Sequence, residues 1–204
     1  MPKSRRDLRE TVIQLLQACG EECDLARVMG ITTARALNLL LSLLPLDDAE
    51  LQPRVVTAAA KAIAAIADQD LETGRVAMRR LIWNLTEESG NCPWGTPELI
   101  GEALAQHHGL AQEFAPILVS YIIPDGNFLD HPTLLRGAVW GIGRLVEKHP
   151  DLLGDALVHL RSLAQHPDPG VQSEAHGVVV TLEARTLLKP QTPTTQNWKP
   201  TTHS

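Results

Sequence analysis

The stretch that decides the fold is "DPGVQSEAHGVVVTLEA", residues 168–184. Asp168 is a residue type that commonly caps the start of a helix. Pro169 suits the first helical position, because a backbone N–H there has no partner within the helix. We therefore expect a helix that begins at Pro169 and includes "PGVQSEAHGVVVTLEARTLL". Three earlier segments of the chain begin in a similar way.

Proline-led helices recur along the chain at a regular interval. Pro53, Pro97, Pro132 and Pro169 are separated by 44, 35 and 37 residues. This is the spacing of a repeat made of two antiparallel helices, each pair of which needs its neighbours to bury its apolar surface. Hydrophobic residues make up 44% of the chain and aromatic residues only 3%, so Leu, Ala, Val and Ile carry the apolar content and favour helix. No segment requires a strand.

The opening stretch also carries a family resemblance. It matches the Asp-Pro-x-Val-x-x-x-Ala opening of many HEAT repeats, and "QPRVVTAAAKAIAAIAD" (52–68) matches it more loosely. Over most of residues 53–188 the chain resembles HEAT-like and armadillo-like repeat proteins. The resemblance implies an all-α fold, a right-handed α-solenoid of about five antiparallel helical pairs. "ESGNCPWGTPE" (88–98) is similar to a loop of uncharacterised bacterial HEAT-like proteins, and implies no particular activity.

The predicted organisation is one helical repeat domain over residues 1–188, with residues 1–50 as an N-terminal cap. Residues 189–204 are predicted to be a disordered C-terminal tail, because they are rich in Pro, Thr and Gln and have no apolar period. Trp198 in this tail is either a docking element or part of a dispensable segment.

Several helix boundaries follow from capping and breaking residues. Ser4 resembles the start of a capping box, and Pro53 is expected to open a helix. Gly109 is expected to close the helix that begins at Thr96, and Pro116 either kinks the next helix or marks its start. A single helix is expected over residues 150–166.

Glycines in "RGAVWGIGRL" are unusual because glycine in a helix interior is unfavourable by roughly 1 kcal/mol against alanine. Gly137 and Gly141 lie four residues apart on one helix face. Either they let a neighbouring helix approach closely, or a ligand lies against the bare face.

The connections between helical pairs form the candidate binding edge. In an alternating stack, these connections share one edge, and "EESGNCPWGT" (87–96) and "PDGNFLDH" (124–131) each hold one of the few aromatic residues. The predicted partner-binding residues are Glu87, Glu88, Asn91, Trp94, Glu98, Asp125, Asn127, Phe128, Asp130, His131, Arg136 and Trp140. Alternatively, Trp94 and Phe128 fold back and plug the ends of the helical pairs.

Two helix faces with a spacing of four residues point toward the same end of the stack. They are Arg79, Trp83 and Glu87, and Arg136, Trp140 and Arg144. Either each Trp packs beside the Arg stems, or a ligand groove lies between the two stripes.

These features predict a non-catalytic protein–protein interaction module that uses the loops and the adjoining groove. The net charge of -6 without a basic block argues against nucleic acid as a partner, and the uncharged stretches are too short for a membrane span. Three cysteines, an odd number, suggest a reducing compartment, so we expect the cytoplasm. No cofactor is expected, because no nucleophile, phosphate-loop or zinc motif occurs.

Two enzymatic alternatives remain at this stage. A small-ligand or metal-dependent enzyme could use the carboxylates Glu87, Glu88, Glu98, Glu102, Asp125 and Asp130, because hard cations take oxygen ligands. A HEAT-like DNA glycosylase is the second alternative, since Trp83 with Glu87 and Trp140 with Arg144 are similar to its working parts. The acidic charge departs from the basic clamp of those enzymes.

Overall fold

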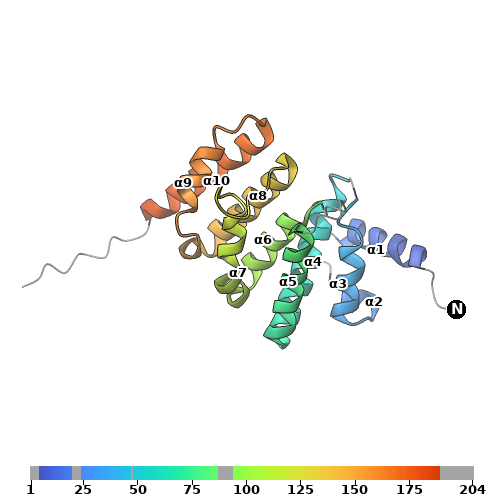
Figure 1. The fold of residues 1–204 in the computed structure, drawn as a ribbon. Coiled ribbons are helices and arrows are strands. Elements are labelled where there is room, and N and C mark those ends of the chain that lie inside the picture. Colours follow the sequence, from blue (N-terminus) through green and yellow to red (C-terminus); the bar gives the residue numbers. More distant parts are fainter. Residues whose placement is uncertain (1–4, 20–23, 47, 87–93, 189–204) are drawn as a thin grey trace, which may run out of the picture.

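The computed structural model describes residues 5–19, 24–46, 48–86 and 94–188, and within them every regular element is a helix (Figure 1). In chain order the elements are α1 (Arg5–Cys19), α2 (Leu25–Met29), α3 (Thr33–Leu41), α4 (Leu51–Gln69), α5 (Leu71–Thr86), α6 (Thr96–Gln106), α7 (His108–Ser120), α8 (Pro132–Lys148), the 3-10 helix η2 (Pro150–Leu152), α9 (Ala156–Leu163) and α10 (Pro169–Leu188). Across these ranges, no helix has the length and apolar character needed to cross a bilayer.

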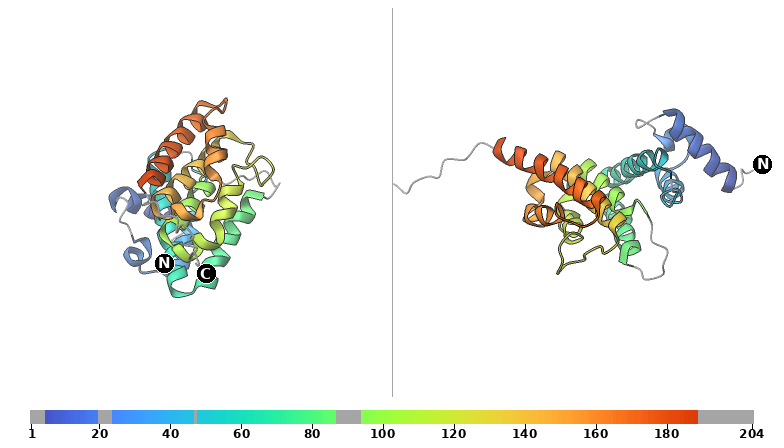
Figure 2. Two further views of the ribbon diagram at one scale, coloured as in Figure 1. Left: turned by 90° about the vertical axis from the view of Figure 1, so that its left-hand side faces the viewer. Right: turned by 90° about the horizontal axis from the view of Figure 1, so that it is seen from above.

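The helices form a stack in which alternate elements build one continuous row. Helix α6 packs against both α4 and α8, and α10 packs against α8, so α4, α6, α8 and α10 form the even row. Helices α5 and α7 pack beside this row and against each other. The stack advances from α1 at one end to α10 at the other (Figures 1 and 2). This is an armadillo/HEAT-like α-solenoid, and the predicted all-α fold is confirmed.

The core follows the even row, and α6 is its most enclosed member. Leu99, Ile100, Ala103 and Leu104 are all fully buried, because α4 and α8 cover α6 on both flanks. Glycines bring α6 and α8 together: a Cβ added to Gly101 would lie only 2.1 Å from the Cα of Gly141. The close-approach interpretation of Gly141 is therefore confirmed.

Side-chain caps account for several helix starts. Asp168 Oδ1 accepts a hydrogen bond from the Val171 N–H at 2.9 Å, as the opening stretch of the sequence predicts. Thr32 Oγ1 caps α3 in the same way, with the Arg35 N–H at 3.3 Å. These caps stabilise helix ends because the first backbone N–H groups of a helix have no intrahelical acceptor.

Two of the predicted boundaries are wrong. Helix α4 begins at Leu51, so Pro53 lies within its first turn, and Asp48 Oδ1 accepts the Leu51 N–H at 2.9 Å. Gly109 lies inside α7, because His107 ends α6 and then caps α7 by accepting the Leu110 N–H at 3.1 Å. Pro116 also lies inside α7 and marks no start.

The expected helix over 150–166 is interrupted. Residues Pro150–Leu152 form η2, and α9 begins only at Ala156. Gly154 between them has a φ of +50°, a left-handed conformation that ends helical geometry. The short helix α2 was not expected from the sequence at all. The predicted capping box at Ser4 and the predicted tail 189–204 lie outside the described residues.

Candidate functional site

The N-terminal halves of the even row surround a hollow of about 230 Å³. Its walls come from all four helices: Gln52 and Pro53 on α4, Glu98 on α6, Arg136, Gly137 and Trp140 on α8, and Glu174 on α10. Because each helix contributes residues from its N-terminal half, the four helices run parallel at this point.

A second hollow, of about 260 Å³, continues the first one between α8 and α10. It is lined by Trp140, Gly143, Arg144, Glu147, Glu174, Gly177, Val178 and Thr181. Trp140 and Glu174 line both hollows, so the two form one surface depression. We call this depression, with all the lining residues of both hollows, the α8 groove.

Glu98 is the most perturbed ionisable group in the groove. Burial raises the pKa of its carboxyl to about 7; its own backbone N–H and the charge of Arg136 lower the pKa, and Glu174 raises it further. The Oε2 atom is buried and accepts no hydrogen bond from any residue that the structure describes. The carboxyl lies against the bare backbone of Gly137, where an added Cβ would lie 2.4 Å from it. The face of Gly137 is thus covered by a side chain of the protein itself.

Glu102, one turn further along α6, is in the opposite electrostatic situation. Burial opposes its ionisation, but hydrogen bonds from Arg144 and Gln106 outweigh burial and hold the pKa below its ordinary value. Arg144 Nε lies 2.6 Å from Glu102 Oε2, and Gln106 Nε2 lies 2.8 Å from Oε1. Glu102 is therefore a structural carboxylate, whereas Glu98 has no comparable neutralising contact.

Trp140 lies half-buried between the two hollows. The guanidinium carbon of Arg144 is 5.9 Å from the centre of its ring, which confirms the predicted packing of Trp beside an Arg stem. The α5 stripe does not share this groove: Arg79 pairs with Glu72, and Trp83 is 66% exposed. Neither hollow is lined by a described residue of α5, so the groove expected between the two stripes is replaced by one between α6, α8 and α10.

The predicted loop edge is partly assembled next to the groove. The rings of Trp94 and His131 meet edge to face, with centroids 4.8 Å apart, so two connections of the chain touch. Trp94 is 36% exposed. Trp94 lies two residues before the start of α6, which carries Glu98 in its first turn, and His131 caps α8 by accepting the Thr133 N–H at 3.2 Å. The Trp94–His131 contact therefore lies at the N-terminal end of the α8 groove.

The other predicted edge residues are dispersed. Phe128 is half-buried and packs against the core, and Asn127 Nδ2 donates to Ser120 Oγ at 2.9 Å. Asp125 and Asp130 are exposed. Glu87, Glu88 and Asn91 lie outside the described residues. The structure thus brings together two sets of predicted residues: Trp94 with His131, and Glu98 with Arg136 and Trp140.

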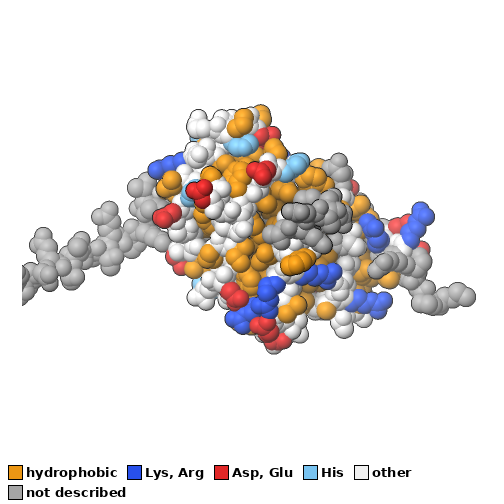
Figure 3. Space-filling model, viewed as in Figure 1, with side chains coloured by type: hydrophobic (Ala, Val, Ile, Leu, Met, Phe, Trp, Pro, Cys, Tyr) orange, Lys and Arg blue, Asp and Glu red, His pale blue; other side chains and the backbone are white. Residues whose placement is uncertain are grey.

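The charge pattern of the face shown in Figure 3 is mixed. In Figure 3, Lys and Arg side chains lie in small groups beside Asp and Glu, with apolar side chains between them. Within the described ranges, no group of three or more His, Cys, Asp or Glu side chains is placed to hold a metal ion.

Glu174 and Gln52 belong to the groove but were missed from the sequence. A usable signal existed for Glu174, because the Asp-Pro-x-Val-x-x-x-Ala motif fixes which face of α10 is buried. Val171 and Ala175 are fully buried, and Glu174 precedes Ala175 at the margin of that face. No comparable signal marks Gln52.

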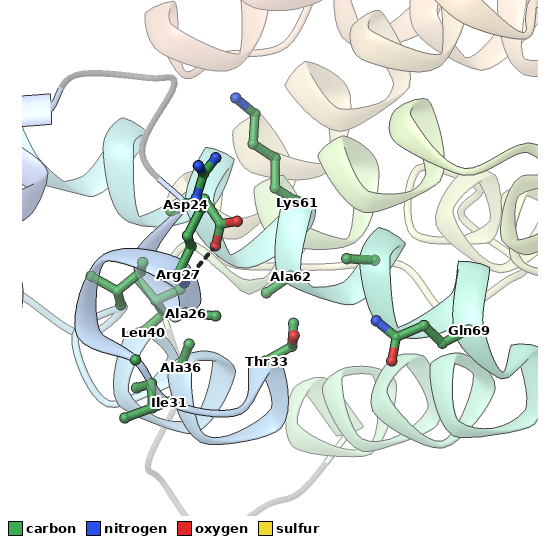
Figure 4. A pocket seen from close by; sticks show the side chains of 14 residues that line it. Asp24, Ala26, Arg27, Ile31, Thr33, Ala36, Leu40, Lys61, Ala62 and Gln69 are labelled. Carbon is green, nitrogen blue, oxygen red and sulfur yellow. Dashed lines mark hydrogen bonds between the residues drawn. The ribbon is translucent and has the colours of Figure 1, made fainter.

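A larger cleft of about 720 Å³ lies between α2, α3 and α4 (Figure 4). Small side chains such as Ala26, Ala36 and Ala62 line it, with Arg27 and Lys61 pointing to one end. Sequence reasoning missed this cleft because it missed α2, whose N-terminus Asp24 caps by accepting the Arg27 N–H at 3.1 Å.

The helix packing defines the class of protein, an α-solenoid of the armadillo/HEAT-like kind. No protein-family model matches the chain, and no curated protein matches it in sequence. Similar solved structures include an engineered protein from a structural genomics consortium, 18% identical with a TM-score of 0.48 over 89% of this chain and 75% of that one. A designed armadillo repeat protein is 17% identical, with a TM-score of 0.29 over 89% of this chain and 95% of that one. The fold class rests on the packing of the helices, since these similarities are too distant to carry an argument.

Proposed function

We propose that the chain is a protein–protein interaction module that holds its partner on the α8 groove and on the adjoining Trp94–His131 edge, and that it catalyses no reaction itself. The observation that carries this proposal is that the two surfaces share the starts of α6 and α8. The depression includes Glu98 and Arg136, near the starts of these helices, and the exposed Trp94–His131 contact lies at the N-terminal ends of the same two helices.

The residue types of this surface suit protein recognition. Trp and Arg dominate the binding energy of protein interfaces, because they bury a large area and keep polar contacts. Trp140, Trp94 and Arg136 provide these types along one path. Carboxylates of the groove add selectivity for a partner with basic or hydrogen-bonding groups.

We place this interaction in the cytoplasm, with a protein rather than a nucleic acid as the partner. The odd number of cysteines favours a reducing compartment, and the net charge of -6 disfavours a polyanionic partner. Glu102, which is buried in the contact between α6 and α8, accepts hydrogen bonds from Arg144 and Gln106. These contacts favour a structural role for this carboxylate over a catalytic one.

The test identifies the partner by site and then measures its affinity. A photo-crosslinking amino acid replaces Trp140, and a matched control replaces Val158, which is 65% exposed on α9. The protein that is crosslinked only from position 140 is purified and titrated against the wild type, Trp140→Ala, Trp94→Ala and Val158→Ala. We expect a loss of at least about tenfold in affinity for the two Trp variants and none for Val158→Ala.

Thermal melts of each variant separate binding from folding, because Trp140 also packs against the core. A partner that binds the folded Trp140→Ala and Trp94→Ala variants as tightly as the wild type would overturn the proposed surface.

A further inference from the structure

We propose that the α4–α6–α8–α10 hollow receives one primary ammonium or guanidinium group of the partner, and that Glu98 releases a proton to solvent as this cation enters. This inference rests on the proposed function, since the hollow is part of the α8 groove. It adds the chemistry of the bound group and a coupled proton.

Charge balance in the hollow is the first reason. Its described lining holds two carboxylates, Glu98 and Glu174, and a single cation, Arg136. When both carboxylates are ionised, one negative charge remains without a matching cation. Arg136 forms no hydrogen bond or ion pair with either carboxylate among the described residues, so neither receives the contact that Glu102 receives from Arg144.

The second reason is the unsatisfied oxygen of Glu98. Oε2 is buried and, among residues 5–19, 24–46, 48–86 and 94–188, has no hydrogen-bond donor. A buried acceptor without a donor is unfavourable, so a ligand that supplies an N–H donor there gains binding free energy. An ammonium or guanidinium supplies several donors together with the missing positive charge.

The size and lining of the hollow limit the ligand to one side-chain-sized cation. A volume of about 230 Å³ is below the usual range of small-molecule pockets. Trp140 forms one wall, and the face of an indole ring attracts a cation within about 6 Å. The carboxyl of Glu98 lies against the bare backbone of Gly137, and both residues line the hollow, so the carboxyl is part of its wall.

The coupled proton follows from the state of Glu98 in the empty groove. The neutral acid accounts for about half of the population near pH 7, because the pKa is about 7. Glu98–COOH plus R–NH₃⁺ gives the ion pair Glu98–COO⁻ with R–NH₃⁺, and the proton goes to water. Thermodynamic linkage then requires that binding weakens as the pH falls below the pKa of Glu98.

The groups that face Glu98 from the neighbouring helices are known within the described chain. Helix α8 contributes Arg136, α10 contributes Glu174, and α4 contributes only the neutral Gln52 and Pro53. Burial raises the pKa of Glu174, while the charge of Arg136 lowers it. Glu98 and Glu174 are therefore the acids whose ionisation a bound cation changes.

The test uses n-butylammonium as a probe of the lysine side chain and n-pentanol as a neutral probe of similar size. Binding to the full chain is followed by the NMR signals of the Gly137 amide and the Trp140 indole N–H, from pH 5 to pH 9. We expect butylammonium affinity to rise about tenfold from pH 5 to pH 6 and to level off above pH 8, and we expect no binding of pentanol.

Two variants serve as controls. Glu98→Gln carries no titrating proton at this position, and we expect it to bind butylammonium weakly and to keep only the pH dependence that Glu174 contributes. Glu183 on α10 forms an exposed ion pair with Arg161 on α9, outside the groove. Glu183→Gln removes one negative charge there and should behave as the wild type does. Binding with no pH dependence in the wild type, or no binding at all, overturns the inference.

The source of the cation is decided by a peptide with one lysine, acetyl-Gly-Lys-Gly-amide, against spermidine. Tighter binding of the peptide supports a protein side chain as the source of the cation. Tighter binding of spermidine overturns that assignment. These outcomes differ from a failure of the proposed function, in which the crosslinked partner ignores Trp140 and Trp94. If the partner still needs both Trp residues but butylammonium fails to bind, the proposed interaction module stands and only the inference of a bound cation is overturned.

Discussion

Two glutamates of α6 show how local contacts decide the role of a residue. Glu98 and Glu102 are one helical turn apart, so they share a helix face and a neighbour, α8. Glu102 meets the guanidinium of Arg144, whereas Glu98 meets the bare backbone of Gly137. One carboxyl is therefore held ionised, and the other keeps its proton up to about neutral pH.

The first prediction concerns the pH dependence of stability. The pKa of Glu98 is about 7 in the folded chain, above the ordinary value of 4.5. The stability that the protonated Glu98 contributes is therefore fully present below pH 4.5 and is lost as the pH rises through 7. The glutamine in Glu98→Gln does not ionise, so the variant keeps this stability at high pH. We expect the variant to gain stability over the wild type between pH 4.5 and pH 8, by on the order of 3 kcal/mol.

Urea denaturation at pH 4.5 and pH 8 measures the difference in free energy of unfolding between Glu98→Gln and the wild type. Glu183→Gln, which also removes one negative charge, is the control. An equal difference between Glu98→Gln and the wild type at both pH values would contradict the assignment of Glu98 as a buried, largely neutral acid.

The second prediction concerns the ion pairs of Arg144. Glu102→Ala leaves Arg144 partly buried without its main acceptor, and we expect a loss of about 2 kcal/mol in the free energy of unfolding. Glu147 also pairs with Arg144, but its side chain is 45% exposed, so Glu147→Ala should change stability by less than about 0.5 kcal/mol. Chemical denaturation at pH 7 checks both, and equal losses would show that burial does not distinguish the two pairs.

At the scale of the helix, glycine has two opposite uses in this chain. Gly101 and Gly141 let the backbones of α6 and α8 touch, whereas an added Cβ on Gly177 in α10 would meet no described atom of another helix within 4 Å. The same residue type is therefore required in one helix and dispensable in another.

The third prediction compares these glycines directly. Gly101→Ala places a Cβ 2.1 Å from the Cα of Gly141, so the two helices must separate, and we expect a loss of about 3 kcal/mol. Gly177→Ala should instead stabilise the chain by about 0.5–1 kcal/mol, because alanine favours helix. Urea denaturation of both variants measures the two shifts, and a neutral Gly101→Ala would mean that α6 and α8 are less tightly apposed.

Most helices could be predicted from the sequence, because their starts carry local signals. Thr32 and Asp168 cap where the residue type indicates, and the proline-led spacing identified the even row. Gly109 was expected to end a helix but lies inside α7, and the helix expected over 150–166 is broken at Gly154, since only the backbone shows which glycine takes a left-handed conformation. Helix α2 has five residues, too few for a periodic pattern.

The candidate site was only partly predictable for a different reason. Glu98, Arg136 and Trp140 were all expected in the binding surface, with Arg136 and Trp140 on a helix face whose groove would lie toward the stripe of Arg79 and Trp83. Their assembly with Glu174 depends on which helices become neighbours, and sequence spacing along one helix does not contain that information. Trp94 and His131 meet because consecutive helix pairs bring two connections to the same end of the stack.

At the scale of the whole molecule, stability is distributed along a line rather than around a centre. In a repeat stack each unit contacts mainly its neighbours, so the free energy is close to a sum of unit and interface contributions. Helices α6 and α8 have even-row neighbours on both sides, whereas α10 is packed from one side of the row. The middle of the stack should therefore open last.

The fourth prediction expresses this gradient in amide hydrogen exchange. We expect the largest opening free energies in α6 and α8 and smaller ones in α1 and in the last turns of α10. Leu135→Ala, which truncates a fully buried side chain of α8, should lower protection in α6, α8 and α10 by about 2–4 kcal/mol and affect α1 far less. If protection falls equally in every helix, the chain unfolds as one cooperative unit and the linear description is wrong. If α1 keeps its protection, the two ends of the stack open independently of each other. Opening of α1 then leaves the α8 groove formed, and a partner bound in the groove stabilises the middle of the stack but not its ends.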